Sequence, residues 1–222
     1  MVAGLVVSVI APTYMTDLVD RSLFETTPVV VAPSRSPLPE LAVGGARYLV
    51  TNDGLKIEAR SNVLRAVMAL SRGLRLPYGE VADTIELRFG PIPTALLKEA
   101  SEAAISVSPN EWAGWIYWDR SQMRYRLWDA KGPRVSASPG SIRYELPSVD
   151  PLDVVFDLHS HGEGPAFFSG VDDEDDRMFP GPVVLAGVLG HCIAGRTPSA
   201  CSRVIANGRL FPPWPSLSAI SL

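Results

Sequence analysis

The sequence predicts an α+β protein of two parts, with helices packed on β-sheets. Residues 94–107 carry apolar side chains at helical intervals, and residues 152–161 contain a Val-Val-Phe run that is typical of a strand buried on both faces. Short runs rich in β-branched and aromatic residues surround these two segments. With 222 residues, of which 46% are hydrophobic, the chain can fill one large core or two small ones.

The composition argues against several classes of protein. A net charge of −4 with scattered lysines and arginines gives no basic surface for nucleic acid. The apolar opening, residues 1–12, has no basic segment before it, is too short to cross a bilayer and runs into Pro12. We therefore expect an initial buried strand there, and neither a signal peptide nor a membrane anchor. Cys192 and Cys201 are too few for a disulfide framework, so we expect free thiols in a reducing, cytoplasmic compartment.

The first part of the chain, residues 1–90, is expected to form a small α+β domain whose role no motif reveals. Residues 47–51 predict a strand, and Asn52–Gly54 is a turn signal. Residues 61–74 begin with a capping serine and predict an amphipathic helix packed on the strands. The apolar residues at helical intervals are Val63, Leu64, Val67, Met68 and Leu70.

The second part, residues 91–222, is expected to contain a helix, several strands, a second helix and a proline-rich tail. A break at residues 89–93 precedes the helix of residues 94–107, and we place the domain boundary there. The second helix begins at Ser169. Strands are predicted at residues 112–119, 123–130, 142–146, 152–161, 183–190 and 201–211, and the tail starts at Phe211.

Two of the three histidines stand two residues apart at the end of the strand predicted for residues 152–161. Because side chains alternate between the faces of a strand, His159 and His161 project from the same side, which is a metal-ligand arrangement. A pair of surface histidines at a strand end is the alternative interpretation of these two residues alone.

The segment after the histidines adds a carboxylate. Gly162, Gly164 and Pro165 predict a loop, after which Ser169 caps a helix whose first turn carries Asp172. Asp172 can therefore come back beside the histidines. Two imidazoles and one carboxylate suit Zn²⁺ and leave a fourth position for water, as a hydrolase needs.

A helix cap alone also accounts for part of this segment. Ser169 and Asp172 nearly match a capping box, and acidic residues in the first turn, Asp173 included, favour the helix dipole without any metal. Capping does not explain why the helix starts eight residues after a His-x-His pair, so we favour the metal site. The later acids Asp175 and Asp176 are expected to face water.

A hydrolase of this kind also needs a base for the metal-bound water. Glu111 is the candidate, because it follows the helix of residues 94–107 and precedes an apolar strand. Burial at the end of the sheet would raise its pKa toward a useful range. An ordinary charged turn residue is the alternative.

Together these residues resemble the JAMM, or MPN-plus, metalloproteases of the JAB domain family. The family pattern is an upstream glutamate, a His-Ser-His, seven intervening residues, and a serine followed three positions later by an aspartate. This chain matches the pattern with Glu111, His159, His161, Ser169 and Asp172.

The resemblance covers about residues 91–211, including the Pro-x-Glu-x-x-Gly context of residues 109–114. It implies a cytidine-deaminase-like mixed sheet flanked by helices. The chain has Gly162 directly after the second histidine, where many family members have proline, and this departure affects the loop shape and not the ligand set. The N-terminal half resembles that of PRTRC system protein A, a bacterial mobile-element family that pairs an uncharacterised domain with a JAMM-like one.

The resemblance implies a zinc isopeptidase or peptidase that cleaves amide bonds at the C-terminal tail of a ubiquitin-like or sulfur-carrier-like protein. Glu111 would then take the proton of the water, and Ser169 would stabilise the oxyanion. An E1/ThiF-like protein of the same cassette is an expected partner, whereas nucleic acid and membrane are not. A small-molecule amidohydrolase with the same zinc site and a non-catalytic scaffold of the cassette are the alternatives.

Overall fold

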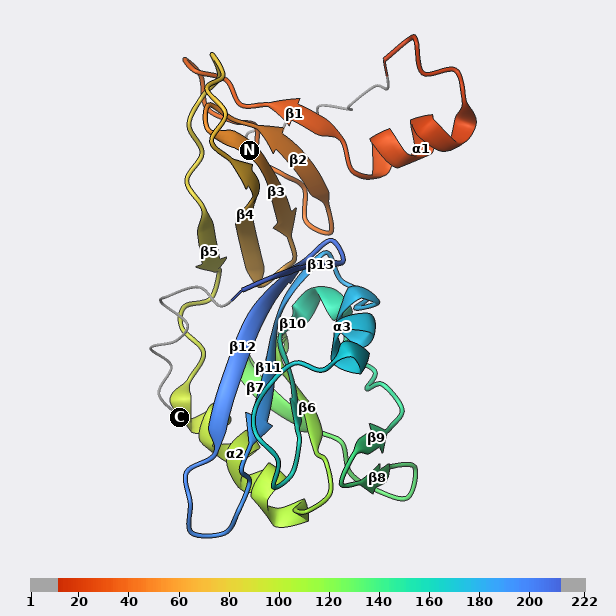
Figure 1. Cartoon of the computed structure of the whole chain (residues 1–222), viewed down its shortest axis with the longest axis vertical. Helices are drawn as coiled ribbons and strands as arrows, with labels where there is room; N and C mark the ends of the chain where they lie inside the picture. Colours follow the sequence, from red (N-terminus) through yellow and green to blue (C-terminus); the bar gives the residue numbers. More distant parts are fainter. Residues whose placement is uncertain (1–11, 213–222) are drawn as a thin grey trace.

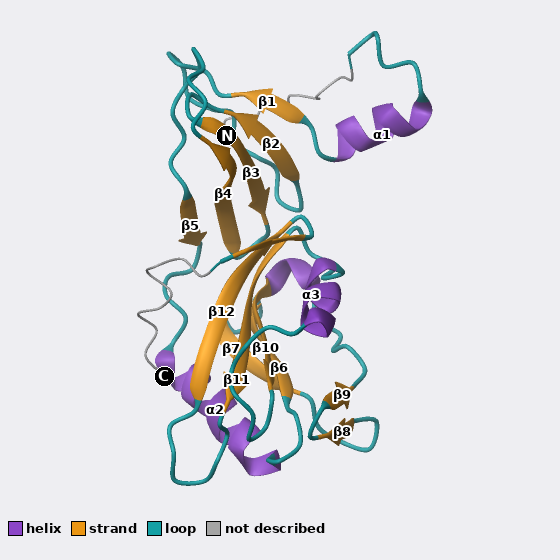
Figure 2. Cartoon of the chain, viewed as in Figure 1, coloured by secondary structure: helices purple, strands orange, loops and turns teal. Residues whose placement is uncertain are grey.

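A computed structural model describes residues 12–212 and confirms the α+β class (Figures 1 and 2). The strand expected in residues 1–11 lies outside the described residues, as does the proline-rich tail from residue 213 onward. Two sheets follow one another along the long axis of the molecule, with the N-terminal sheet at one end (Figure 1). Within residues 12–212 no helix is long and apolar enough to cross a membrane.

The N-terminal sheet has five strands in the order β1-β2-β3-β4-β5. β1 runs parallel to β2, and the other neighbours are antiparallel. The strand predicted at residues 47–51 and the turn at Asn52–Gly54 are confirmed, because the turn joins β2 to β3. The elements of this part are α1 (Leu18–Thr26), β1 (Val29–Val31), β2 (Ala46–Val50), β3 (Gly54–Arg60), β4 (Leu64–Arg72) and β5 (Thr84–Leu87).

The helix predicted for residues 61–74 is wrong, because the segment forms the strand β4. The side chain of Ser61 does accept hydrogen bonds from two backbone N–H groups that follow it, as a helix cap would, but it closes a turn into the strand. β4 lies between β3 and β5, and Val67 is buried together with its neighbours Ala66 and Met68. Burial of successive residues, and so of both faces, produced the helix-like spacing.

The C-terminal sheet has six strands in the order β13-β12-β11-β10-β6-β7 and is mixed, because β10 and β11 run parallel. α2 packs on one face, and α3 lies on the other (Figure 1). The elements are α2 (Thr94–Val107), β6 (Ala113–Asp119), β7 (Arg124–Asp129), β8 (Ser136–Ser138), β9 (Ser141–Arg143), the 3₁₀ helix Pro151–Asp153, β10 (Val154–Ser160), α3 (Gly170–Arg177), β11 (Val183–Gly190), β12 (Ser199–Ala206) and β13 (Arg209–Phe211).

Most elements predicted for this part are confirmed. α2 has the bounds of the helix predicted at residues 94–107, and a strand occurs in each of the six predicted segments. The single strand predicted for residues 201–211 is wrong, since the segment forms the hairpin of β12 and β13. Asn207 and Gly208 both adopt positive φ between these strands, as the tight turn of a hairpin requires.

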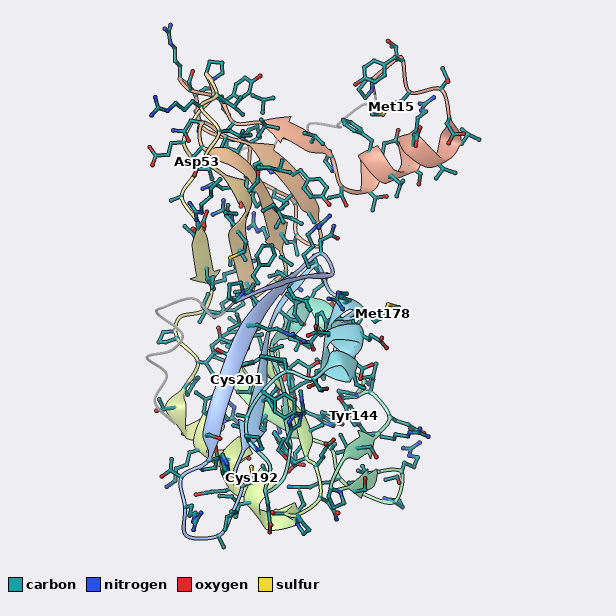
Figure 3. The ribbon with its side chains drawn as sticks, in the orientation of Figure 1. Met15, Asp53, Tyr144, Met178, Cys192 and Cys201 are labelled. Carbon is teal, nitrogen blue, oxygen red and sulfur yellow. The ribbon has the colours of Figure 1, made fainter. Side chains whose placement is uncertain are left out.

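One hydrophobic core runs through both sheets. Ile57 of the N-terminal sheet belongs to the same cluster of buried side chains as Leu185 of the C-terminal sheet. The domain boundary at residues 90 and 91 stays a prediction. Cys192 is buried in that cluster and Cys201 is half-buried on β12; both are free thiols, as expected (Figure 3).

Candidate metal centre

The two adjacent histidines lie at the end of β10, in the interior of the C-terminal sheet. His159 pairs with Ala113 on β6 and with Val188 on β11, so its position is fixed from both sides. His161 follows the strand, and its backbone N–H donates to the carbonyl of Leu189 at 2.9 Å. The two rings are partly buried and lie side by side, with centroids 5.3 Å apart.

Ser169 and Asp172 form a complete capping box at the start of α3. The backbone N–H of Asp172 donates to the Ser169 hydroxyl oxygen at 3.2 Å, and the backbone N–H of Ser169 donates to Oδ2 of Asp172 at 2.6 Å. The same carboxylate faces both histidines. The helix cap and the cluster are therefore not exclusive alternatives, because Asp172 takes part in both.

The three side chains place their ligand atoms within 4.8 Å of one another. Nε2 of His159 is 3.2 Å from Oδ1 of Asp172, and Nε2 of His161 is 3.5 Å from Oδ2. Zn²⁺ with bonds of about 2.0–2.1 Å holds tetrahedral ligands about 3.3 Å apart, so these separations suit one shared ion. Nε2 of His159 is also buried without a hydrogen-bond partner, which a cation would satisfy. The residues present therefore fit zinc.

The local charges keep the carboxylate of the cluster ionised. Burial by itself raises the pKa of Asp172, but the His159 imidazole and the N–H of Ser169 hold that pKa well below its usual range. Burial by itself lowers the pKa of His159, and its anionic neighbours Asp172 and Asp157 bring the net shift above the usual value. The site thus attracts positive charge.

Glu111 lies in the loop between α2 and β6 and lines a cavity of about 230 Å³ together with the three candidate ligands. Its backbone N–H donates to the carbonyl of Ser138 on β8 at 2.9 Å, which fixes the loop. Burial raises the pKa of the Glu111 carboxyl; His159 opposes the shift, and Asp172 adds to it. A carboxylate with a raised pKa can act as a general base near neutral pH.

Three polar residues that also line this cavity, Asp157, Tyr144 and Ser141, were not among the predicted site residues. Asp157 lies two residues before His159 on β10, so the alternation of the strand could have revealed it. Burial raises the pKa of Asp157 to about 7, with His159 opposing the shift and Asp176 adding to it. Tyr144 follows β9 (Figure 3), and no spacing in the sequence connects it with the histidines.

The acids that follow in α3 differ in their surroundings. Asp175 is exposed, as predicted. The prediction that Asp176 faces water is wrong, because this residue is buried and its carboxylate accepts a hydrogen bond from Nε of Arg203 on β12 at 2.6 Å. The two residues are 27 positions apart, so the acidic run itself could not reveal the partner.

Gly162, where many JAMM proteins have proline, is required by the shape of the loop. Its φ of +53° lies in the left-handed region, and a Cβ on it would overlap the backbone carbonyl oxygen of Pro109. Its own carbonyl accepts a hydrogen bond from the N–H of Cys192 at 2.8 Å. The loop after the histidines is therefore pinned between two other segments.

A mixed sheet with one helix on each face, a His-x-His strand end and a capping aspartate beside it define a protein of the JAB-domain class. The chain belongs to the prokaryotic homologs of the JAB domain, a family that matches residues 93–204, just over half of the chain. The family predicted from the motif is confirmed at this level.

The N-terminal part matches a different family. Residues 17–88 correspond to a domain of unknown function (DUF2016), which covers α1 and all five strands of the first sheet. No curated protein matches the chain. The narrower likeness of the N-terminal half to PRTRC system protein A stays a prediction.

Proposed function

We propose that the chain is a zinc-dependent isopeptidase or peptidase that hydrolyses amide bonds at the C-terminal tail of a ubiquitin-like or sulfur-carrier-like protein. The observation that carries this proposal is the convergence of His159, His161 and Asp172 around an unpartnered buried nitrogen, in a cavity shared with Glu111. The JAB family includes metalloproteases, which supports the same chemistry. An E1/ThiF-like protein of the same bacterial cassette is the partner that fits such a substrate.

The proposed reaction gives each residue one task. Zinc, when bound, lowers the pKa of a coordinated water to about 7 and polarises a substrate carbonyl. Glu111 accepts the proton of the attacking water on its carboxylate and passes it to the nitrogen of the leaving amine. The Ser169 oxygen accepts the N–H of Asp172, so its hydroxyl hydrogen stays free to donate to the oxyanion.

The surroundings of the cavity favour an extended tail as substrate. About 230 Å³ is below the roughly 300–1,000 Å³ of small-molecule sites, which argues for a narrow segment over a compact ligand. The small sheet of β8 and β9 borders the cavity through Gly140, Ser141 and Ile142. An extended tail can add backbone hydrogen bonds to the free edge of such a hairpin.

The test combines metal content with one conservative substitution. We expect one zinc per purified full-length chain by elemental mass spectrometry, with anomalous scattering at the zinc edge between the three ligands. The substrate is a ubiquitin-like protein whose C-terminal Gly-Gly carries a fluorogenic amine. Glu111→Gln should keep zinc and lose about 10²- to 10⁴-fold in rate. Glu163→Gln, exposed in the nearby loop, is the matched control and should behave as wild type.

The outcomes separate the three hypotheses. Equal hydrolysis by Glu111→Gln and wild type rejects the proposed mechanism. Hydrolysis of small amides only, with no action on the protein tail, favours the amidohydrolase. Zinc that binds tightly in a chain without any amidase activity favours the non-catalytic scaffold.

A further inference from the structure

A buried arginine lies beneath the helix that carries Asp172. Arg203 on β12 is 6% exposed, and the sheet places it level with Ala186 on β11 and Asp157 on β10. Residues in such a row project from the same face, which here is the face on which α3 lies. Because the residue between them is only alanine, the long side chain of Arg203 has room to extend under α3.

The guanidinium of Arg203 contacts α3 and the residue before its cap through four groups. Nε donates to the carboxylate of Asp176 at 2.6 Å, and Nη2 donates to the backbone carbonyl of Asp172 at 3.1 Å. Nη1 donates to the carboxylate of Asp173. The plane of the group stacks on the ring of Phe168, with 3.8 Å between the guanidinium carbon and the ring centroid. One side chain thus contacts both turns of the helix and the residue before its cap.

α3 also contacts β13, but it has no buried apolar side chain of its own to fix it on the sheet. The helix has eight residues, a length that is marginal for a helix without tertiary contacts. Its single buried residue is Asp176, the ion-pair partner of Arg203. The ion pair within the helix, between Arg177 and Asp173, joins two side chains that are both accessible to solvent. The orientation of α3 therefore depends on Arg203 more than on an apolar face.

We propose that Arg203 is a positioning residue of the metal centre: through the Asp172 carbonyl and the two neighbouring carboxylates it sets the place of the Asp172 side chain relative to the histidines. This inference rests on the proposed zinc site. Residues outside the ligand set that orient a ligand typically change metal affinity 10- to 100-fold.

The test measures zinc affinity in the folded full-length chain. The dissociation constant is obtained by competition with a chromophoric chelator, and the visible spectrum of the cobalt-loaded protein reports on the ligand geometry. Arg203→Met should weaken zinc binding about 10- to 100-fold and change the cobalt spectrum. Arg203→Lys keeps the charge, but its compact ammonium lacks the planar, widely spaced donors of the guanidinium, so we expect a smaller loss than in Arg203→Met. Arg177→Met, on the exposed side of α3, is the matched control and should bind zinc as wild type does.

Hydrogen exchange of the metal-free chain gives a second readout. The amides of α3 should exchange faster in Arg203→Met than in Arg177→Met, because the contact that holds the helix is gone. A purely structural arginine would lower the melting temperature and leave the zinc affinity of the folded protein unchanged. That result, with wild-type protection of α3, overturns the inference.

Two further outcomes keep the inference distinct from the proposed function. If Arg203→Met does not fold, Arg203→Lys decides, and a wild-type dissociation constant in that variant overturns the positioning role. If the wild-type chain binds no zinc, both the proposed function and the inference fail. A zinc-binding wild type with an unaffected Arg203→Met defeats the inference alone.

Discussion

Glu58→Gln is expected to destabilise the protein strongly. Glu58 on β3 is 1% exposed, and its two carboxylate oxygens accept hydrogen bonds from Nε of Arg47 at 2.6 Å and from Nε of Arg65 at 2.7 Å. Glutamine replaces one acceptor oxygen by an NH₂ group, which then faces a guanidinium donor. Because Arg47 is itself only 6% exposed, its charge would remain buried without a full partner.

The size of the effect follows from burial. Breaking a buried ion pair by removing one partner costs about 3–5 kcal/mol. For a chain of roughly 150–250 residues each kcal/mol shifts the melting temperature by about 2–4 °C, so we expect a decrease of about 6–20 °C. Glu86→Gln is the matched control, because Glu86 pairs with the same Arg65 from an exposed position and should cost less than about 1 kcal/mol.

The assay is thermal and urea unfolding followed by circular dichroism. Since one hydrophobic core includes both sheets, we expect a single transition that moves as a whole in Glu58→Gln. A loss of less than about 1 kcal/mol, or a loss equal to that of Glu86→Gln, would refute the reasoning about the buried pair. Two separate transitions would show that the two sheets unfold independently.

Three further changes have defined outcomes. Gly162→Ala should lower the free energy of unfolding by at least about 1–3 kcal/mol and weaken zinc binding, because Gly162 has a positive φ and a Cβ on it would overlap Pro109. Gly140→Ala is the control and should change neither quantity, because a Cβ on Gly140 would meet no atom within 4 Å. Urea unfolding measures the stability of both variants, and chelator competition measures their zinc affinity. Ser169→Ala should lower the free energy of unfolding by about 1 kcal/mol, because the helix cap is lost, and should lower the rate of hydrolysis about 10²- to 10³-fold. A folded Ser169→Ala variant that hydrolyses the substrate at the wild-type rate would contradict the oxyanion role of Ser169. Removing zinc with a chelator should lower the melting temperature of the protein. A ligand present at 100 times its Kd stabilises the folded state that binds it by about 2.7 kcal/mol, and the chelator removes this contribution. An unchanged melting temperature would contradict a zinc site in the folded state.

The candidate site could be predicted because its determinants are local in the sequence. Strand alternation places His159 and His161 on one side, and the interval from Ser169 to Asp172 is that of a capping box. The same local logic predicted α2 with its observed bounds. Asp157 obeys the same alternation of β10 as His159, so it too could have been predicted.

The features that sequence analysis missed or misread depend on distant segments. β4 looks helical because neighbouring strands and the second sheet bury both of its faces, and a single-sequence pattern does not contain those neighbours. The burial of Asp176 requires Arg203 from another strand. The hairpin turn at Asn207 and Gly208 is the exception, because that dipeptide is itself a local turn signal.

The capping box has a consequence for how a metal ion would be received. The carboxylate of Asp172 is already immobilised by the N–H of Ser169 when the chain folds, so its rotational freedom is lost before any ion arrives. An ion that enters then meets a rigid ligand and need not order it, which favours tight capture from dilute solution. Loading can accordingly be fast and need no folding step, unlike in small domains that are unfolded without their metal.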